Sequence, residues 1–315
     1  MNINSLSLWW NIFLKHFSLN DSTFNFINEN NTLLFFKRHI KKYRLFNLKY
    51  ISTQFLENAS PDFYNFDLDQ SQLHKLIKEL DKEGWDVLNL KYLSRPDSNI
   101  DELETFLHLN HFKFKKTIAT RIYYIDLTLF KTWENYRKSL SRNHKNEIKK
   151  RENKLNANVN WEYKFNQKMD NENLYKIIEN LHLKRQREMN RTSFLESDRG
   201  KAFLKDLLSN FLKQDILVYS IIYINQQPVS YTLGFKTEKI YYHWSIGFDT
   251  DYSKFSPNKV NHRYLIESCI KLGLKEFNFM RGQGKYKKQW TKNFRESYEY
   301  KIKNNKKFIL KFLQL

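Results

Sequence analysis

Three consecutive strand-like segments joined by very short connections constrain the fold of this chain most. Residues 216–224, 228–236 and 239–248 are rich in β-branched and aromatic side chains, which favour extended backbone. Only Asn225-Gln226-Gln227 and Thr237-Glu238 separate them. Parallel neighbours need a crossover of about a dozen residues, so these segments must run antiparallel. The pattern excludes a purely parallel, doubly wound sheet.

Segments with helical periodicity flank these strands on both sides. The other elements predicted in this half are helices at 173–189, 199–213, 258–272 and 285–290, and strands at 276–280, 298–303 and 307–312. Gly273 suits the end of the helix at 258–272, because glycine accepts a left-handed backbone. Antiparallel hairpins mixed with helices in this order predict an α+β fold.

The first part of the chain shows a similar alternation. Residues 24–27 and 32–36 predict a hairpin around an Asn-rich turn. The remaining predicted elements are strands at 43–52, 85–92 and 121–127, and helices at 71–83, 100–109 and 130–155. The helix at 130–155 carries the most charge, and we expect the domain boundary beside it. The predicted units are therefore residues 1–128 and 129–315.

The chain is strongly basic, with 54 Lys and Arg against 34 Asp and Glu and a formal net charge of +20. Nucleic acid, an anionic membrane and anionic small molecules are the partners that such a charge favours. An AT-rich genome, which raises the Lys content without a functional reason, is the alternative. A single cysteine, Cys269, excludes a disulfide framework and any multi-cysteine metal site.

The segment Leu6–Leu14 is apolar but too short to span a bilayer. We predict an amphipathic helix, and the alternative is interfacial membrane contact through Trp9, Trp10 and Phe13. The segment has no basic leader with a small-residue cleavage site. The expected location is the cytoplasm, with peripheral contact with the inner face of the membrane left open.

Four ordered motifs resemble one known family. They are WENYRKSLSRNHKNEIKKRENKL (133–155), INQQPVSYTLGF (224–235), FDTDYSKFSPNKVNHRYLIE (248–267) and FNFMRGQGKYKKQWT (277–291). Together they resemble the CelD-like acetyltransferase domain family of the GNAT superfamily, which is related to the Fem peptidyltransferases. The resemblance implies two tandem GNAT-like halves, each a mixed, mainly antiparallel sheet flanked by helices.

The same resemblance implies an acyl-CoA-dependent N-acyltransferase. Its co-substrate would be an acyl-CoA, acetyl-CoA first, and its acceptor the amine of an amino sugar or a similar phosphate-bearing molecule in surface polysaccharide biosynthesis. One alternative is a Fem-like transferase that uses aminoacyl-tRNA. Another is a catalytically inactive GNAT-like protein that binds nucleic acid or anionic membrane. A phosphate-bearing substrate accounts for the local basic clusters without DNA.

A helix start after an apolar strand is the predicted coenzyme site. Ser256, Pro257, Asn258 and Lys259 open the helix at 258–272, and helix N-termini bind anions through backbone N–H groups. Ser256 suits the N-cap and Pro257 the first turn. The family prefers Gly where this chain has Asn258, and Asn tolerates the left-handed region. The alternative is a capped structural helix.

A basic aromatic cluster and a basic helix supply the predicted substrate contacts. Lys287 is the candidate for stabilising the thioester oxyanion, with Arg281, Tyr286 and Trp290 around the substrate. Arg142, beside Ser141 and His144, is predicted to bind a substrate phosphate. A solvated basic turn and a solvated helix face are the alternatives.

Candidate proton acceptors are Asp249, at the end of the strand at 239–248, and His243 within that strand. Glu267 is a third, and a reaction without a residue acting as base is also open. The nine His show no ligand spacing such as HExxH, and Cys269 is expected to be buried. No metal site is predicted.

Overall fold

The computed structural model describes residues 3–17, 23–27, 33–42, 47–53, 66–95, 98–282 and 284–307. The chain divides into two compact units. Unit 1 comprises residues 1–16 and 123–294, and unit 2 comprises residues 17–122 and 295–315. The predicted units, 1–128 and 129–315, differ from this division because both terminal segments belong to the unit that is remote in sequence.

Unit 1 contains most of the helices and a six-stranded part of the sheet. Its helices are α1 (Ile3–His16), α4 (Trp133–Ser139), α5 (Arg142–Asn158), α6 (Asn171–Glu188), α7 (Asp198–Lys213), α8 (Pro257–Lys271) and α9 (Lys287–Trp290), with short 3-10 helices η1 (Leu127–Leu129), η2 (Phe194–Glu196) and η3 (Thr250–Phe255). Its strands are the end of β5 (Phe114–Asp126), β6 (Trp161–Phe165), β7 (Leu217–Ile224), β8 (Gln227–Lys236), β9 (Ile240–Phe248) and β10 (Glu276–Arg281).

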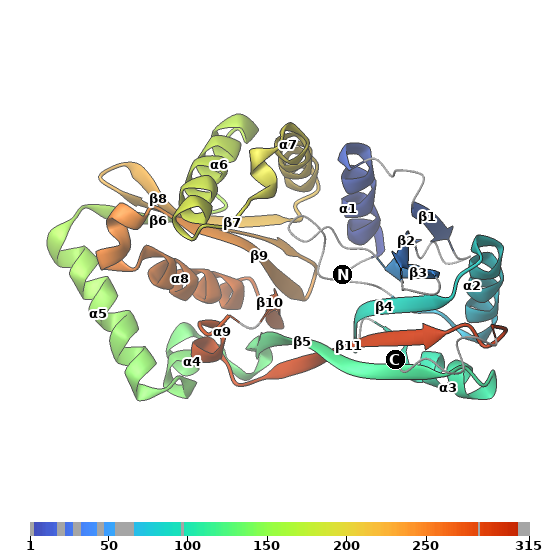
Figure 1. The fold of residues 1–315 in the computed structure, drawn as a ribbon. Helices are drawn as coiled ribbons and strands as arrows, with labels where there is room; N and C mark the ends of the chain where they lie inside the picture. The colour runs from blue at the N-terminus through green and yellow to red at the C-terminus, as the bar shows by residue number, and fades with distance from the viewer. Residues whose placement is uncertain are drawn as a thin grey trace. The chain divides into compact units, whose positions relative to one another are not determined.

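The strands of unit 1 lie in the order β5-β10-β9-β8-β7-β6. β6, β7, β8 and β9 pair antiparallel, as the short connections predict, whereas β9 and β10 pair parallel across the crossover helix α8. Helices α6 and α7 cover one face of this sheet and α8 covers the other (Figure 1). Apolar side chains from α4, α8, β9 and β10 form the core beneath α8.

Unit 2 repeats this plan. Its elements are β1 (Thr23–Ile27), β2 (Leu33–Lys42), β3 (Asn47–Thr53), α2 (Gln70–Glu83), β4 (Val87–Ser94), α3 (Ile100–Leu109), most of β5 and β11 (Phe294–Lys303). β1, β2 and β3 pair antiparallel, and β3 and β4 pair parallel across α2. Three antiparallel strands, a crossover helix and a parallel strand thus occur twice, which confirms the α+β fold.

The closing strand of unit 2 comes from the far end of the chain. β11 follows α9 in the sequence, yet it pairs antiparallel with β4. In unit 1, the place beside β10 is taken by the end of β5, where the Leu127 N–H donates to the Lys275 carbonyl at 2.8 Å. A contiguous division of the sequence cannot describe such units, since a closing strand is selected by long-range pairing.

One predicted helix differs from the structure, and one observed strand was not predicted. The single helix expected at 130–155 is two helices, α4 and α5, because Leu140 is extended (φ −72°, ψ 155°) and Ser141 caps α5. The Ser141 side chain accepts from the His144 N–H at 3.3 Å. β6 was not predicted. The strand expected at 307–312 falls, apart from Lys307, outside the described residues.

Helix α1 is part of the aromatic core of unit 1. The Trp9 side chain is 0% exposed and packs edge-on against Phe203, Phe211 and Trp244. Phe13 is also buried. This packing contradicts membrane insertion of Trp9 and Phe13, the alternative drawn from the sequence. Among the described helices, none combines the length and apolar character that a bilayer-spanning segment requires.

Candidate functional site

β9 and β10, the parallel strands of unit 1, are paired over a short stretch and separate beyond it. Only the start of β10 is paired with β9, from Glu276 opposite Ile240 to Asn278 opposite Tyr242. β9 also bulges against β8, since Leu233 faces Ser245 while Gly234 faces His243. A bulge increases local twist and re-aims side chains. The segments beyond this point, His243–Phe248 and Phe279–Arg281, are therefore free to diverge around a ligand.

A cavity of about 530 Å³ lies at this end of the strands. Its lining residues come from the end of α6, β9, the η3–α8 connection and α9: Arg185, Gln186, Met189, Arg191, Ile246, Phe248, Ser253, Ser256, Pro257, Asn258, Lys259, His262, Gly284, Tyr286, Gln289 and Trp290. The size suits a small-molecule site, and basic groups stand beside aromatic walls. All of these residues belong to unit 1.

The cavity brings together two segments that the sequence proposed separately. The four predicted coenzyme residues line it with Tyr286 and Trp290. Arg142, Asp249 and His243 are outside the lining, as are Arg281 and Lys287. Sequence reasoning missed Arg185, Gln186, Met189 and Arg191 at the end of α6, and Phe248 and His262. The basic run Lys184–Arg191 was a signal that could have found the first group.

The start of α8 differs from the prediction. Ser256 is the N-cap residue, as predicted, but its backbone is left-handed (φ 52°) and its side chain makes no capping hydrogen bond. Pro257 is the first helical residue, as expected. Asn258 is helical, and its Oδ1 accepts from Ser230 Oγ at 2.8 Å. The strain of this connection lies at Ser256, while Asn258 anchors the first turn to β8.

A buried polar network continues from Asn258 under α8. Asn261 Nδ2 donates to Ser230 Oγ at 3.1 Å, and Asn261 Oδ1 accepts from Ser220 Oγ at 2.6 Å. Thr232 is 2.5 Å from the same Ser220 hydroxyl. Buried polar groups that are all paired fix a unique arrangement. The network therefore fixes the pocket end of α8 on β7 and β8.

His243 and His262 form a chain of hydrogen bonds behind the cavity wall. His262 Nδ1 is 3.0 Å from the Asn258 carbonyl, and its Nε2 is 3.0 Å from His243 Nε2. Tyr241 Oη is 3.2 Å from His243 Nδ1. A carbonyl only accepts, so His262 Nδ1 carries a proton, and the His243 Nε2–H donates to His262. His243 Nδ1 then accepts from Tyr241.

Burial keeps both imidazoles neutral. Burial lowers the pKa of His262 to about 4, while burial and the neighbouring His262 and Lys287 lower the pKa of His243 well below its usual value. Burial also raises the pKa of Tyr241 well above its usual value. His243, a predicted proton acceptor, is thus 4% exposed with both ring nitrogens engaged.

Lys287 is buried beneath the loop that follows β10. Its ammonium donates to the carbonyls of Met280 (3.0 Å) and Arg281 (2.7 Å), and 5% of the residue is exposed. Met280 has φ 58° and Gly282 has φ 108°, so the loop uses a backbone that favours glycine. Lys287 therefore holds this loop in place.

The two aromatic residues of the same segment form one wall. Trp290 is buried, and its carbonyl accepts from the Tyr136 hydroxyl at 2.5 Å. Tyr286 is partly exposed at the mouth, and burial raises its pKa to about 12. Both rings lie near the His262 ring, with centroids 5.8 and 5.6 Å away. The wall is neutral at physiological pH.

Basic groups occupy the other walls. Lys259 pairs with Glu147 of α5 at 2.5 Å, and the Arg185 guanidinium lies 4.7 Å from the centre of the Phe248 ring. Arg191 is exposed beside the cavity. Arg142 is exposed as the first residue of α5. The charge of the lining favours an anionic ligand.

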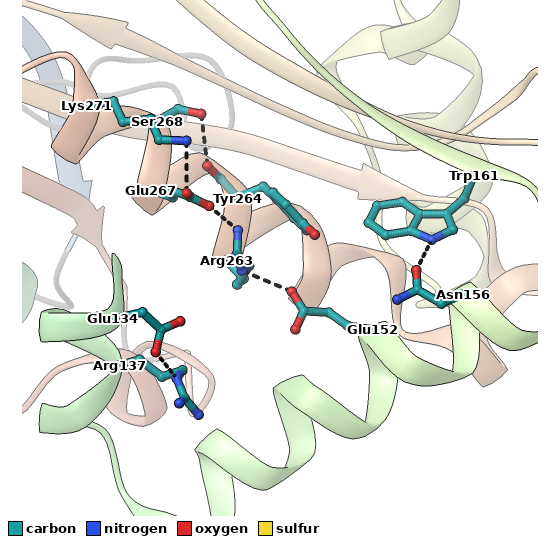
Figure 2. Close-up of polar contacts among 10 residues, drawn as sticks. All are labelled: Glu134, Arg137, Glu152, Asn156, Trp161, Arg263, Tyr264, Glu267, Ser268 and Lys271. Carbon is teal, nitrogen blue, oxygen red and sulfur yellow. Dashed lines mark hydrogen bonds and ion pairs between the residues drawn. The ribbon is translucent and has the colours of Figure 1, made fainter. Parts of the chain in front are cut away.

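Asp249 and Glu267 are both engaged in ion pairs. Asp249 accepts from the Asp251 N–H at 3.0 Å as the cap of η3, and it pairs with Lys184. The hydrogen bonds that Lys184 donates to Asp249 and Asp251 raise the pKa of Lys184. Glu267 pairs with Arg263 and with Lys271, the latter at 2.9 Å (Figure 2).

Arg263 joins α8 to its neighbours. Its guanidinium lies between Glu152 of α5, at 2.9 Å, and Glu267 one turn along α8 (Figure 2). It also stacks on the rings of Trp133 and Tyr264, with its central carbon 4.8 and 4.0 Å from the ring centres. Burial raises the pKa of Glu152 despite Arg263. This contact fixes α4 and α5 against α8.

No group of His, Cys, Asp and Glu within the described ranges could hold a metal ion. Cys269 is buried, and burial raises the pKa of its thiol, which opposes a role as nucleophile.

One family model matches the part of the chain that forms most of the cavity. Residues 142–288 match the model of the acetyltransferase (GNAT) domain, a range that contains every residue of the cavity wall except Gln289 and Trp290. None of the curated proteins matches the chain.

Three solved structures share the fold over nearly the whole chain. A conserved protein of unknown function from Bacteroides thetaiotaomicron has 14% identity and a TM-score of 0.59, covering 94% of this chain and 90% of its own. L-PGS from Bacillus licheniformis has 10% identity and a TM-score of 0.59, with 98% and 94% covered. FemX has 10% identity and a TM-score of 0.59, with 97% and 93% covered.

Proposed function

Since residues 142–288 match the model of the acetyltransferase (GNAT) domain, we propose that this chain is an acyl-CoA-dependent N-acyltransferase. The acceptor is the amine of an amino sugar or a similar phosphate-bearing molecule, within surface polysaccharide biosynthesis. The observation that carries the proposal is the overlap of the family domain with the basic, aromatic cavity at the opened β9–β10 pair. Acetyl-CoA is the first co-substrate to test.

The cavity offers complementary groups to a coenzyme thioester. The proposed site for the pyrophosphate is the start of α8, where the helix dipole and Lys259 favour negative charge. Arg185 and Arg191 face the same space from the end of α6 and add charge. Phe248, Tyr286 and Trp290 supply apolar walls for the uncharged part of the ligand.

The reaction forms a carbon–nitrogen bond and breaks a carbon–sulfur bond. The amine attacks the thioester carbonyl, the tetrahedral intermediate expels the thiolate, and the proton leaving nitrogen ends on that sulfur. Asp249 is the proposed proton acceptor for two reasons: its side chain is 22% exposed, and the residue comes directly after Phe248, which lines the cavity. Lys287 is proposed to act by positioning Tyr286 and Trp290, and Arg281 and Arg142 by contacting the acceptor.

Calorimetric titration with acetyl-CoA and longer acyl-CoAs tests the proposal. Wild-type protein is expected to bind at least one of them, and Lys259→Ala to bind it several-fold more weakly. Lys239→Ala is the matched control, since it removes the same charge from an exposed position just before β9, outside the cavity lining. Absence of binding to every acyl-CoA would refute the proposal.

Transfer from aminoacyl-tRNA is the second candidate, favoured by the exposed basic residues of α5. Arg142, Lys149 and Lys150 of α5 are exposed. RNA held through phosphates would bind with a logarithmic salt slope of about 0.7–0.9 for each phosphate neutralised. Salt-independent or absent tRNA binding would exclude this candidate.

A further inference from the structure

Among the described residues, three cations and no acidic side chain line the cavity. The cations are Arg185, Arg191 and Lys259. Lys259 is already neutralised, because it pairs with Glu147 at 2.5 Å. In the part of the chain that the structure describes, no carboxylate forms an ion pair with Arg185 or Arg191. The uncompensated positive charge of the lining therefore lies at the end of α6 and just after it.

Three carboxylates at the end of α6 and around η3 have other partners. Lys184 pairs with Asp249 and with Asp251, the latter at 2.7 Å. Glu188, the last residue of α6, accepts from the Thr250 hydroxyl. These contacts join the end of α6 to η3. They hold the helix end in place and leave the charge of the two arginines to the cavity.

The guanidinium of Arg185 is held against an aromatic wall. Its central carbon lies 4.7 Å from the centre of the Phe248 ring, and Phe248 also lines the cavity. The residue is half-buried, and its side chain makes no hydrogen bond to another described residue. Contact with a ring face leaves the in-plane N–H groups available as donors, and their fork matches the oxygens of a phosphate. A donor that is already positioned binds an anion at a lower entropic cost.

The two arginines favour a phosphate monoester over a singly charged anion. A phosphate monoester carries a charge of about −1.5 to −2 at pH 7 and has three acceptor oxygens. Arg185 and Arg191 supply two guanidinium groups to one cavity. The proposed pyrophosphate site uses another element, the start of α8, so the arginines form a second anion subsite.

We propose that Arg185, together with Arg191, binds a phosphate monoester of the substrate at the end of α6. The inference rests on the proposed function for the identity of the molecule that carries this phosphate. Coenzyme A carries one such group, the 3′-phosphate, and a sugar-phosphate acceptor carries another. Arg185 sets affinity and specificity in this view, and it takes no part in bond making.

Three variants separate this role from a structural one. Arg185→Met removes the guanidinium and keeps an apolar side chain against Phe248. Arg185→Lys keeps the charge and loses the fork, and it replaces the first variant if Arg185→Met lowers the melting temperature markedly. Arg187→Met is the matched control, because Arg187 lies in the same last turn of α6 but is exposed and outside the lining. A cation that served only the C-terminal end of the helix would give the same result at either position.

The variants are compared with wild type by calorimetric titration with CoA, with dephospho-CoA, which lacks the 3′-phosphate, and with inorganic phosphate. A salt concentration of about 0.15 M screens the general attraction of exposed charges. Arg185→Met should bind the phosphate-bearing probe roughly tenfold or more weakly, the usual effect of losing a hydrogen bond to a charged group. Arg185→Lys should lie between Arg185→Met and wild type, and Arg187→Met should bind as wild type does.

The probes distinguish the two sources of the phosphate. A wild-type preference for CoA over dephospho-CoA that Arg185→Met abolishes places the phosphate on the coenzyme. Equal binding of CoA and dephospho-CoA, with inorganic phosphate bound beside CoA and weakened by Arg185→Met, places it on the acceptor.

Other outcomes overturn the inference. It fails if Arg185→Met binds every probe as wild type does, or if Arg187→Met weakens binding equally. It also fails if wild type neither prefers CoA nor binds inorganic phosphate. Wild-type binding of inorganic phosphate without either form of the coenzyme refutes the proposed function, and the phosphate titration of Arg185→Met then decides the inference alone. Wild-type binding of no probe overturns both.

Discussion

The Nε2 atoms of His243 and His262 lie 3.0 Å apart, and one proton lies between them. Because His262 Nδ1 must donate to the Asn258 carbonyl, that proton belongs to His243. The bonds from Tyr241 through both imidazoles to Asn258 therefore all point the same way, and they end at the first turn of α8. That turn lines the cavity, so the pair supports the proposed coenzyme site from behind.

Replacing one histidine of this pair should lower the free energy of unfolding by more than replacing the second histidine in the resulting variant does. His262→Phe leaves the His243 N–H buried without an acceptor, and we expect a loss of about 1–3 kcal/mol in the free energy of unfolding. The double variant His243→Phe/His262→Phe should cost less than the sum of the single variants. Urea unfolding of the four proteins measures the coupling, and strict additivity would contradict the hydrogen bond.

Acid should destabilise the protein through two buried imidazoles, His144 and His262. The pKa values of His144 and His262 are lowered to about 4, whereas in the unfolded chain each titrates near 6.5. Between pH 6.5 and pH 4, these two imidazoles therefore bind protons in the unfolded state but not in the folded state. The stability present above pH 6.5 should fall by up to about 1.4 kcal/mol per pH unit for each imidazole until pH 4. Urea midpoints between pH 4 and 7 measure the slope, which His144→Phe should reduce.

The sequence was sufficient for features that depend on local pattern. The three strands between 216 and 248 were predicted because their connections are too short for crossovers. The start of a helix identified Ser256–Lys259 as a candidate site. Separately, a basic aromatic cluster identified the segment Tyr286–Trp290. Their meeting in one cavity could not be derived from local pattern, since it depends on how α8 and α9 pack.

Features that depend on long-range packing were missed for the same physical reason. The pairing of β11 with β4 joins segments about 200 residues apart, which no local periodicity encodes. In the sequence, Arg185 and Arg191 are ordinary basic residues near the end of a helix. Only the packing of that helix beside β9 shows that they line the cavity. The left-handed residue of this connection is Ser256 and not Asn258, which is helical and accepts a hydrogen bond from Ser230 on β8.

Lys287 offers a test of positioning against direct catalysis. Lys287→Met removes the ammonium that donates hydrogen bonds to the Met280 and Arg281 carbonyls. We expect the free energy of unfolding to fall by about 1–3 kcal/mol and KM to rise. Lys288→Met, at the exposed neighbouring position, is the control and should change neither. A variant that keeps its stability and KM but loses kcat would instead place Lys287 at the reacting atoms.

Arg263 should be the most sensitive charged residue of unit 1. Arg263→Met leaves Glu152 without its cation, while Glu267 keeps Lys271, and we expect a loss of about 2–3 kcal/mol, below the range for fully buried pairs because these groups retain some exposure. Arg263→Lys keeps the charge but loses the fork and the stacking on Trp133 and Tyr264, and should recover part of the loss. Unfolding midpoints measure both, with Arg137→Met, at an exposed pair with Glu134, as control (Figure 2). Equal effects of Arg263→Met and Arg137→Met would show that the contact adds nothing to stability.

Asp249 combines a structural and a proposed catalytic role, and two substitutions divide them. Asp249→Asn keeps an oxygen that can accept from the Asp251 N–H, so η3 should stay capped, while the charge that pairs with Lys184 is lost. If Asp249 accepts the proton of the amine, kcat/KM should fall by roughly a hundredfold or more in Asp249→Asn. Lys184→Met removes only the ion-pair partner, so it should retain most of the activity. Should Asp249→Asn and Lys184→Met lower the rate equally, the ion pair and not proton transfer is what the reaction needs.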